Sequence, residues 1–391
     1  MSDLAPYAFP DFASRGRRHD EPSHPFRTPF QRDRERIVHS SAFRRMTGKT
    51  QVLVASVNDH HRTRLTHTLE VTQVARTVAR RLRLNEDLTE AIALAHDIGH
   101  PPFGHAGENT LHSCLLDHGG FNHNLYGLRR VDELEERYPE FPGLNLTYEV
   151  REAFVRHANR MDATEGDEFR NLGSPFLEAL VVDAVDSIAY DTHDIDDALG
   201  LGFLTFDDLE SVECWHRAAS AVRAKYPTLP PHPFRTAVVR ELLAWQVTDL
   251  IDETAKRIAN HRIDSRESVR STKEVLVASS ELGERLKSGL ERFLHARVYR
   301  HDDVLAMKAN GDRVLRALFE EFVKRPNLLP ERHLRRWVGA DAIIGKSTSP
   351  TLPGRTPIAA LPLVVGDFLA GMTDRYALRE HRRLFQSSSD L

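Results

Sequence analysis

Helical periodicity is the feature that most constrains the fold of this 391-residue chain. Apolar residues recur at the spacing of an α-helix through long segments, whereas alternating runs of β-branched residues bounded by turns are scarce. Outside the motifs discussed below, we expect helices over residues 32–45, 235–260, 284–295, 312–322 and 357–378. The pattern therefore predicts an all-α fold.

The composition favours an intracellular globular protein. Lys plus Arg number 53 and nearly balance 57 Asp plus Glu, so no global positive charge favours nucleic acid as the main ligand. With only Cys114 and Cys214, neither a disulfide framework nor a thiolate metal site is expected. No apolar run approaches the roughly 20 residues that cross a bilayer, and the amino terminus lacks the apolar region of a signal peptide. We expect a cytoplasmic protein without a membrane partner.

A His-Asp pair, His96 and Asp97, ends an apolar helical segment and indicates half of a metal site. Asn85 or Asp87 can cap the start of this helix, and the glycine and prolines that follow the pair stop it. The pair therefore lies at a helix end. It faces a loop, residues 99–108, that adds two more histidines and a glutamate.

Two further potential ligands lie on predicted helices before and after this pair. A helix that opens near residue 63 places His67 near its first turn. Another begins near Ser174 and carries Asp186, Tyr190 and Asp194 at intervals of four residues, along one line of its surface. Two imidazoles and two carboxylates suit a divalent Mg, Mn, Fe, Co, Ni or Zn ion and discriminate poorly among them.

The order of His67, His96, Asp97 and Asp186 resembles that of the HD phosphohydrolase superfamily, an all-helical group that hydrolyses phosphate esters and anhydrides. The surrounding sequence is similar, more specifically, to the deoxyguanosine triphosphate triphosphohydrolase family. The similar segments run in order through residues 26–45, 49–51, 64–71, 96–108, 121–124, 186–197 and 371–377.

This resemblance implies a metal-dependent triphosphohydrolase that cleaves a deoxynucleoside triphosphate, with dGTP as one candidate, into deoxynucleoside and tripolyphosphate. Ligand spacing alone does not choose the α-phosphorus over the γ-phosphorus. One divalent ion is the implied cofactor, with Mg or Mn preferred and Fe, Co, Ni or Zn left open. The resemblance further implies a homo-oligomer, a hexamer in relatives, with a nucleotide or single-stranded DNA as effector.

The implied architecture is an HD-domain helical core with additional carboxy-terminal helices. We divide the chain into a flexible amino-terminal segment (1–25), a metal-binding catalytic core with its first helix (26–205) and a carboxy-terminal helical region (206–391). The last region is expected to contribute to the nucleotide pocket and to oligomer contacts. A Pro-rich stretch at 224–233 predicts a hinge, and the polar stretch 161–173 is either a lid or a plain surface loop.

His105 is the candidate general acid. If the bond to the sugar 5′ oxygen breaks, the leaving alkoxide needs a proton, and a histidine titrates near the working pH. Glu108 lies three residues further on and can hold the ring, and the resemblance gives the same pair. The competing interpretation is a hydrogen bond that only braces the loop. By resemblance, His123 is a further catalytic histidine that touches phosphate, whereas His100 either binds phosphate or shapes the loop.

Substrate contacts are expected from five further residues. Arg64 lies one turn before His67 on the same helix face and can bind phosphate oxygens through both arms of its guanidinium. The resemblance places Tyr190 under the deoxyribose, where its ring would crowd a 2′ hydroxyl, and Asp194 on the 3′ hydroxyl; an ordinary core role for Tyr190 is the alternative. Gln51 and Asp374 match family regions near the base, and a carboxylate suits the guanine donors.

Other interpretations stay open at this point. The protein could be an HD phosphohydrolase acting on nucleoside monophosphates or cyclic nucleotides, or a non-catalytic nucleotide or DNA sensor that keeps the metal for structure. His193, Asp196 and Asp197 are interpreted as a solvated or capped helix end rather than as ligands. Most of the arginines between 32 and 45 are interpreted as a solvated or ion-paired helix face.

Overall fold

The computed structural model describes residues 4–51, 62–157, 167–169, 172–337 and 360–385. Within these ranges the regular secondary structure is helical, and strand pairing is limited to isolated bridges. The predicted all-α fold is therefore confirmed. No helix in these ranges is long and apolar enough to cross a membrane.

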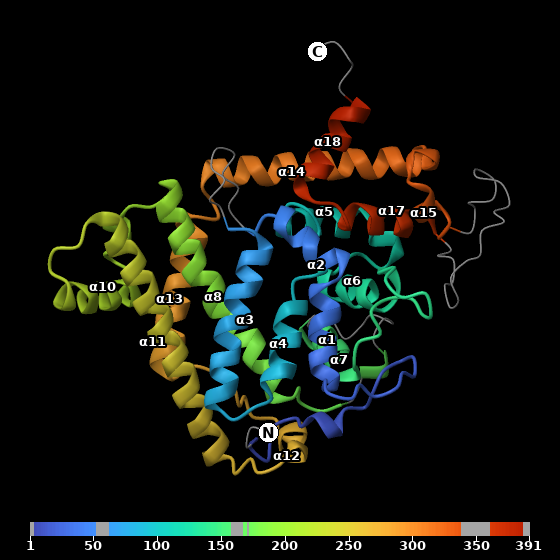
Figure 1. Ribbon diagram of the computed structural model, residues 1–391. Helices are drawn as coiled ribbons and strands as arrows, with labels where there is room; N and C mark the ends of the chain where they lie inside the picture. The colour runs from blue at the N-terminus through green and yellow to red at the C-terminus, as the bar shows by residue number, and fades with distance from the viewer. Residues whose placement is uncertain (1–3, 52–61, 158–166, 170–171, 338–359, 386–391) are drawn as a thin grey trace.

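Seventeen α-helices are present in the described residues (Figure 1). They are α1 (Pro29–Val38), α2 (Ser41–Arg45), α3 (Arg64–Arg81), α4 (Glu86–Ala95), α5 (Gly104–Cys114), α6 (His123–Arg129), α7 (Tyr148–His157), α8 (Leu177–Leu201), α9 (Phe206–Leu209), α10 (Glu213–Lys225), α11 (Pro231–Asn260), α12 (Arg266–Ser271), α13 (Glu281–Arg297), α14 (Asp302–Lys324), α15 (Glu331–Leu334), α17 (Leu361–Ala370) and α18 (Asp374–Phe385).

Helices α3, α4 and α8 pack against one another in the middle of the molecule (Figure 1). Helix α3 starts with a capping box in which the Thr63 and Thr66 side chains satisfy each other's backbone N–H groups. Helix α4 starts at Asn85, whose side chain accepts a hydrogen bond from the Leu88 N–H at 3.2 Å, as its sequence predicts. Helix α4 is buried nearly all round, so the two polar residues that follow its carboxyl end, His96 and Asp97, lie in the interior.

Three hydrophobic clusters hold the remaining helices around this centre. The first surrounds α3, α4 and α8 and includes residues of α11 and α12, the second joins the end of α8 to α10, α11 and α13, and the third joins α5 to α14 and α17. Figure 1 shows α14 across one end of the molecule, beside α5 and α17. Each cluster contains residues from both sides of residue 205. The division of the chain at that residue into a catalytic core and a carboxy-terminal region stays a prediction.

Two of the segments predicted as single helices each contain two helices in the structure. The segment 32–45 breaks at His39, because the Ser40 hydroxyl accepts a hydrogen bond from the Phe43 N–H at 3.1 Å and starts α2. The segment 357–378 is divided between α17 and α18, and its first three residues lie outside the described ranges. Most of the polar stretch 161–173 also lies outside them. Local capping therefore sets helix ends that periodicity alone does not reveal.

Gly99, directly after the turn that carries His96 and Asp97, allows this turn to lie against α6. A Cβ atom at Gly99 would lie 1.9 Å from the carbonyl oxygen of His123 and 2.6 Å from the backbone nitrogen of Gly127. Both neighbours are backbone atoms, which cannot move aside as a flexible side chain can. The close approach therefore requires a residue without a side chain.

We predict that Gly99→Ala lowers the free energy of unfolding by about 1–3 kcal/mol, because an overpacked backbone contact must open. Urea denaturation measures the change. The matched control is Gly289→Ala in α13, where an added Cβ meets no atom within 4 Å. Helix propensity predicts a gain of up to about 1 kcal/mol there. A Gly99→Ala protein as stable as the wild type would contradict the close contact.

Candidate metal centre and catalytic loop

Two helix ends and the interior of a third helix bring the predicted metal ligands together. His67 lies in the first turn of α3, His96 follows the last residue of α4, and Asp186 lies on α8. The His67 Nε2 atom is 2.8 Å from Asp186 Oδ1, and His96 Nε2 is 3.5 Å from the same oxygen. One potential ligand atom from each residue lies within 4.8 Å of the others.

Asp97 adjoins this group and is held by a separate set of contacts. Its Oδ1 is 3.7 Å from His96 Nε2 and 2.9 Å from His100 Nδ1. Arg64 donates through one Nη atom to both oxygens of Asp97, at 3.0 and 3.1 Å. Burial would raise the pKa of Asp97, but Arg64 and the histidines hold this pKa well below its usual range. Asp97 is therefore an ionised carboxylate at the edge of the group.

These residues fit a divalent cation. The Nδ1 of His96 is 2.6 Å from the Ala93 carbonyl oxygen, which leaves Nε2 buried without a hydrogen-bond partner and turned toward Asp186. Burial alone would lower the pKa of His96, yet the carboxylates of Asp97 and Asp186 raise it to about 9. Surroundings that hold a proton so firmly attract positive charge, and the donor set is one that divalent metals bind.

His193 and Glu70 form a hydrogen-bonded chain behind His67 that we did not expect from the sequence. His193 Nδ1 lies 3.2 Å from His67 Nδ1, and His193 Nε2 lies 2.9 Å from Glu70 Oε2. If each imidazole donates toward Glu70, the His67 Nε2 is left with its lone pair facing Asp186. Burial lowers the pKa of His193, which fits a neutral ring in this chain. His193 is buried and lies inside α8, so its interpretation as a solvated or capped helix end is wrong.

The spacing in α8 contains the signal for this second histidine. His193 lies seven residues after Asp186, two helical turns along the same face, and is buried. Its neighbour Asp197 is ion-paired with Arg62 at 2.6 Å, and Arg62 also contacts Glu70. The polar residues at this end of α8 thus belong to an ordered network with Arg62 and Glu70.

We predict that His193→Ala weakens Mn²⁺ binding by roughly 10- to 100-fold, because His67 would lose the partner that orients its ring. Calorimetric titration of the apoprotein with MnCl₂ measures this. His216→Ala, which changes an exposed histidine on α10, is the control and should bind Mn²⁺ like the wild type. Unchanged affinity in the His193 variant would refute the orienting role.

The segment 99–108, predicted as a loop, is a loop only up to Phe103, because α5 begins at Gly104 and carries both His105 and Glu108. We keep the name catalytic loop for this segment, and its Glu108 is a carboxylate shared by two histidines. Glu108 Oε1 is 2.8 Å from His123 Nδ1, and Glu108 Oε2 is 3.4 Å from His105 Nδ1. Burial opposes ionisation of Glu108, but its hydrogen bonds to both rings lower its pKa below the usual range. The His105 side chain is 57% exposed, whereas that of His123 is 14% exposed. The predicted His105–Glu108 pair is therefore present, and His105 is its solvent-facing member.

His100 connects this loop to the metal ligands. Its ring lies over that of His123, with centroids 3.7 Å apart, while its Nδ1 contacts Asp97 as described above. Burial lowers the pKa of both histidines, and nearby Arg64 lowers them further. His100, Glu108 and His123 also have ligand atoms within 4.8 Å of one another. The metal group and the catalytic loop are therefore one continuous polar site.

A pocket of about 270 Å³ opens beside His105. Gln51 and Tyr190 line it, as does Tyr299 from the turn after α13. The Tyr299 hydroxyl donates to Asp194 Oδ2 at 2.5 Å, so the buried Asp194 lies behind Tyr299 and is not among the lining residues. Burial raises the pKa of Asp194 well above its usual value. Tyr299 has no motif around it in the sequence that would have identified it.

Asp374 holds two segments of the site through backbone contacts. Its Oδ2 accepts hydrogen bonds from the Thr50 N–H at 3.0 Å and from the Thr50 hydroxyl, and its Oδ1 accepts from the Phe103 N–H at 3.0 Å. Phe103 has a left-handed φ of 63° at the start of α5, a conformation that needs such support. Asp374 does not line the pocket, whereas Gln51, next to Thr50, does and has a buried Oε1 with no hydrogen-bond partner among the described residues.

Lys49 also holds the loop that carries His100 in place. Its buried ammonium donates to the carbonyl oxygens of His100 at 2.5 Å and Ala370 at 2.9 Å. Burial lowers its pKa well below the usual value, and nearby arginines act in the same direction. It joins the loop that carries His100 to the end of α17, and it lies 321 residues before Ala370 in the chain.

Comparison with known proteins gives two family matches. The HD domain family matches residues 64–191, which contain all four predicted ligands, and a phosphohydrolase-associated domain matches 277–348 and 355–383. The fold and the site thus define an HD-domain phosphohydrolase, a hydrolase with a candidate site for a divalent metal.

Near full-length relatives give the particular family. The chain is 43% identical to a deoxyguanosinetriphosphate triphosphohydrolase-like protein of Bordetella pertussis, over 99% of this chain and 97% of that protein. Proteins of the same name from Thiobacillus denitrificans (43% identical, 98% and 97% covered) and Geobacter metallireducens (42% identical, 98% and 96% covered) match similarly. The chain belongs to the deoxyguanosinetriphosphate triphosphohydrolase-like family.

Proposed function

We propose that this protein hydrolyses a deoxynucleoside triphosphate at its α-phosphorus and releases a deoxynucleoside and tripolyphosphate. One observation carries the proposal: His100 contacts both Asp97 of the metal group and His123 at the start of α6, beside a pocket with room for a sugar and base. The names of the relatives support dGTP as one substrate. The homo-oligomer, its nucleotide or DNA effector and the cytoplasmic location stay predictions.

His67, His96, Asp97 and Asp186 would hold the metal, with Mg or Mn preferred. When bound, a divalent cation supplies Lewis-acid stabilisation of charge on a phosphate oxygen and lowers the pKa of a water molecule. The histidines on α3 and α4 are already turned toward Asp186 by Glu70, His193 and the Ala93 carbonyl. The chain thus presents its ligands in one orientation.

His105 donates the proton that the leaving 5′ oxygen requires. Its side chain is exposed, so a substrate can reach it, and Glu108 holds its ring. His123, held on the other oxygen of Glu108, is the second histidine facing the phosphates. Arg64 orients Asp97 through one Nη and has an unpartnered Nε, so a phosphate contact would add to its role rather than replace it.

The sugar and base occupy the pocket beside His105. Tyr190 lines it as the proposed filter against a 2′ hydroxyl, and Tyr299 lies next to it, with ring centroids 6.3 Å apart. Asp194 reaches the sugar through the Tyr299 hydroxyl or after that hydroxyl moves. Gln51 offers its unpartnered amide oxygen to the base, and Asp374 supports the base pocket by holding Thr50 and Phe103.

Product analysis tests the reaction. We expect incubation with each deoxynucleoside triphosphate and Mn²⁺ or Mg²⁺ to give tripolyphosphate and deoxynucleoside, separable by anion exchange, with slower turnover of the matching ribonucleotides. Release of orthophosphate from a nucleoside monophosphate, or opening of a cyclic nucleotide, would instead assign another HD phosphohydrolase activity. Absence of all three products would favour a nucleotide sensor.

We predict that His105→Ala lowers kcat by roughly two to four orders of magnitude, because a positioned general acid contributes about that much. Metal content and nucleotide affinity should stay near wild type, since His105 is exposed and outside the ligand group. Asp97→Ala provides the contrast and should lose metal and turnover together. If His105→Ala reduced nucleotide affinity and left kcat unchanged, the acid role would be wrong.

A further inference from the structure

His100, Glu108 and His123 form a second cluster of potential metal ligands beside the metal group. They come from three segments: the loop after α4, helix α5 and the first position of α6. One nitrogen or oxygen atom of each residue lies within 4.8 Å of those of the other two, the same spread as in the metal group on α3, α4 and α8. The fold therefore gathers two sets of three donor side chains.

The contact between His123 and Glu108 has the geometry of two ligands of one ion. His123 Nδ1 lies 2.8 Å from Glu108 Oε1, the same distance that separates His67 Nε2 from Asp186 Oδ1 in the metal group. Adjacent ligand atoms that are each roughly 2.0–2.2 Å from one ion lie about 3 Å apart. A cation can therefore replace the proton between His123 and Glu108 with little movement of either side chain.

His100 offers a donor atom that no hydrogen bond uses within the described residues. Its Nε2 is buried and has no partner there, and the whole residue is 4% exposed. A buried polar nitrogen without a partner is unfavourable, and a bond to a metal ion would remove that cost. The ring lies against that of His123, with centroids 3.7 Å apart, so joint binding of one ion requires this stack to open.

The charge of Glu108 is not matched by an arginine or a lysine within the described residues. Its ion-pair contacts there are with His105 and His123, although its side chain is only 15% exposed. Arg64, which lies beside Asp97, is paired with that carboxylate at 3.0 Å. A carboxylate with so little solvent is stabilised by a cation at close range, and a divalent ion would supply that charge.

We propose that His100, Glu108 and His123 form a second cation site, which prefers Zn²⁺ or a similar transition-metal ion over Mg²⁺. Two imidazoles and one carboxylate are a known ligand set for Zn²⁺, whereas Mg²⁺ prefers oxygen ligands. An ion at this site draws Glu108 away from His105 and covers His123. Occupation therefore inhibits hydrolysis, a consequence that rests on the proposed function, whereas the binding itself does not.

Calorimetric titration of the metal-free full chain with ZnCl₂ tests the second site without a measurement of activity. We expect two ions per wild-type chain, one for each ligand group, and at most one ion with MgCl₂. Glu108→Gln keeps the shape of the side chain and removes its charge, so this variant should bind one Zn²⁺. Asp186→Asn should also bind one, because it weakens the metal group and leaves the second site intact.

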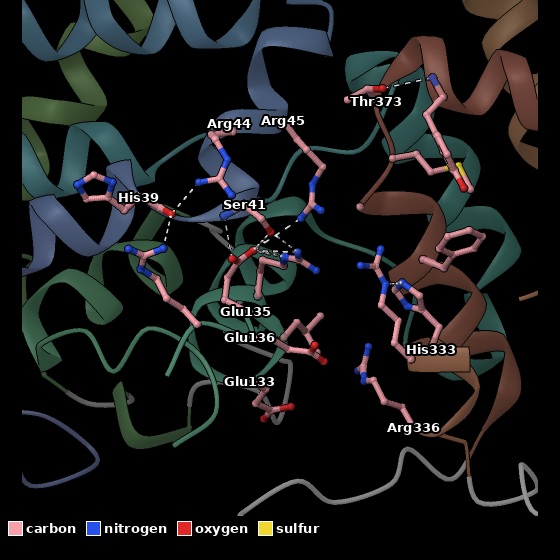
Figure 2. Close-up of a pocket in the computed structure, with 18 residues that line it drawn as sticks. His39, Ser41, Arg44, Arg45, Glu133, Glu135, Glu136, His333, Arg336 and Thr373 are labelled. Carbon is pink, nitrogen blue, oxygen red and sulfur yellow. Dashed lines mark hydrogen bonds and ion pairs between the residues drawn. The ribbon is translucent and has the colours of Figure 1, made fainter. Parts of the chain in front are cut away.

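His123→Ala gives an independent reading of the second site and should likewise bind one Zn²⁺. His39→Ala is its matched control, because His39 is exposed and belongs to neither ligand group. Figure 2 shows His39 at a separate cavity, of about 550 Å³, between α2 and α15. The control should bind two ions, as the wild type does.

The numbers of bound ions decide between the outcomes. Two ions in the wild type and in His39→Ala, with one in Glu108→Gln and His123→Ala, support the second site. A single ion in the wild type, or two ions in both of these variants, would overturn it. Loss of both ions in Glu108→Gln would also overturn it, because the two groups would then be one site. Failure to detect tripolyphosphate as a product would refute the proposed function and leave these numbers unchanged.

Discussion

The meeting of His67, His96 and Asp186 is the interaction on which the rest of this structure depends. An ionised carboxylate inside a helical core is unfavourable unless a proton, a cation or hydrogen bonds compensate its charge. The compensation comes from three helices at once, so α3, α4 and α8 must pack in one register for the site to exist. The Glu70–His193 chain, the Arg64–Asp97 pair and the close contact of Gly99 all serve this register.

A second set of contacts positions the catalytic loop from far along the chain. Lys49 and Asp374 tie the backbone near His100, Thr50 and Phe103 to the carboxy-terminal helices. The strained φ at Phe103, directly before the helix that carries His105 and Glu108, is held by Asp374. The third hydrophobic cluster, around α5, α14 and α17, is therefore part of the machinery that places His105. A cavity of about 550 Å³ between α2 and α15 lies where the same two parts of the chain meet.

Sequence reasoning was strongest where a residue type and its local spacing carry the information. The helix end at His96, the first turn of α3 and the line of Asp186 and Tyr190 on α8 could be predicted because helical periodicity fixes faces locally. It was weaker for polar residues whose partners are distant. His193 was interpreted as a solvated or capped helix end because its role depends on Glu70 and His67, and Tyr299 was missed because its partner Asp194 lies 105 residues away.

The sequence by itself determined the helical class, the ligand types and their order, since these follow from periodicity, capping and side-chain chemistry along a single stretch of chain. Only the tertiary structure decided which residues share one carboxylate, that Asp374 supports the loop through backbone contacts, and that arginines near residue 45 face those near residue 332 across a cavity. The physical reason is that charge pairing and burial depend on distances between segments, and local pattern does not encode those distances.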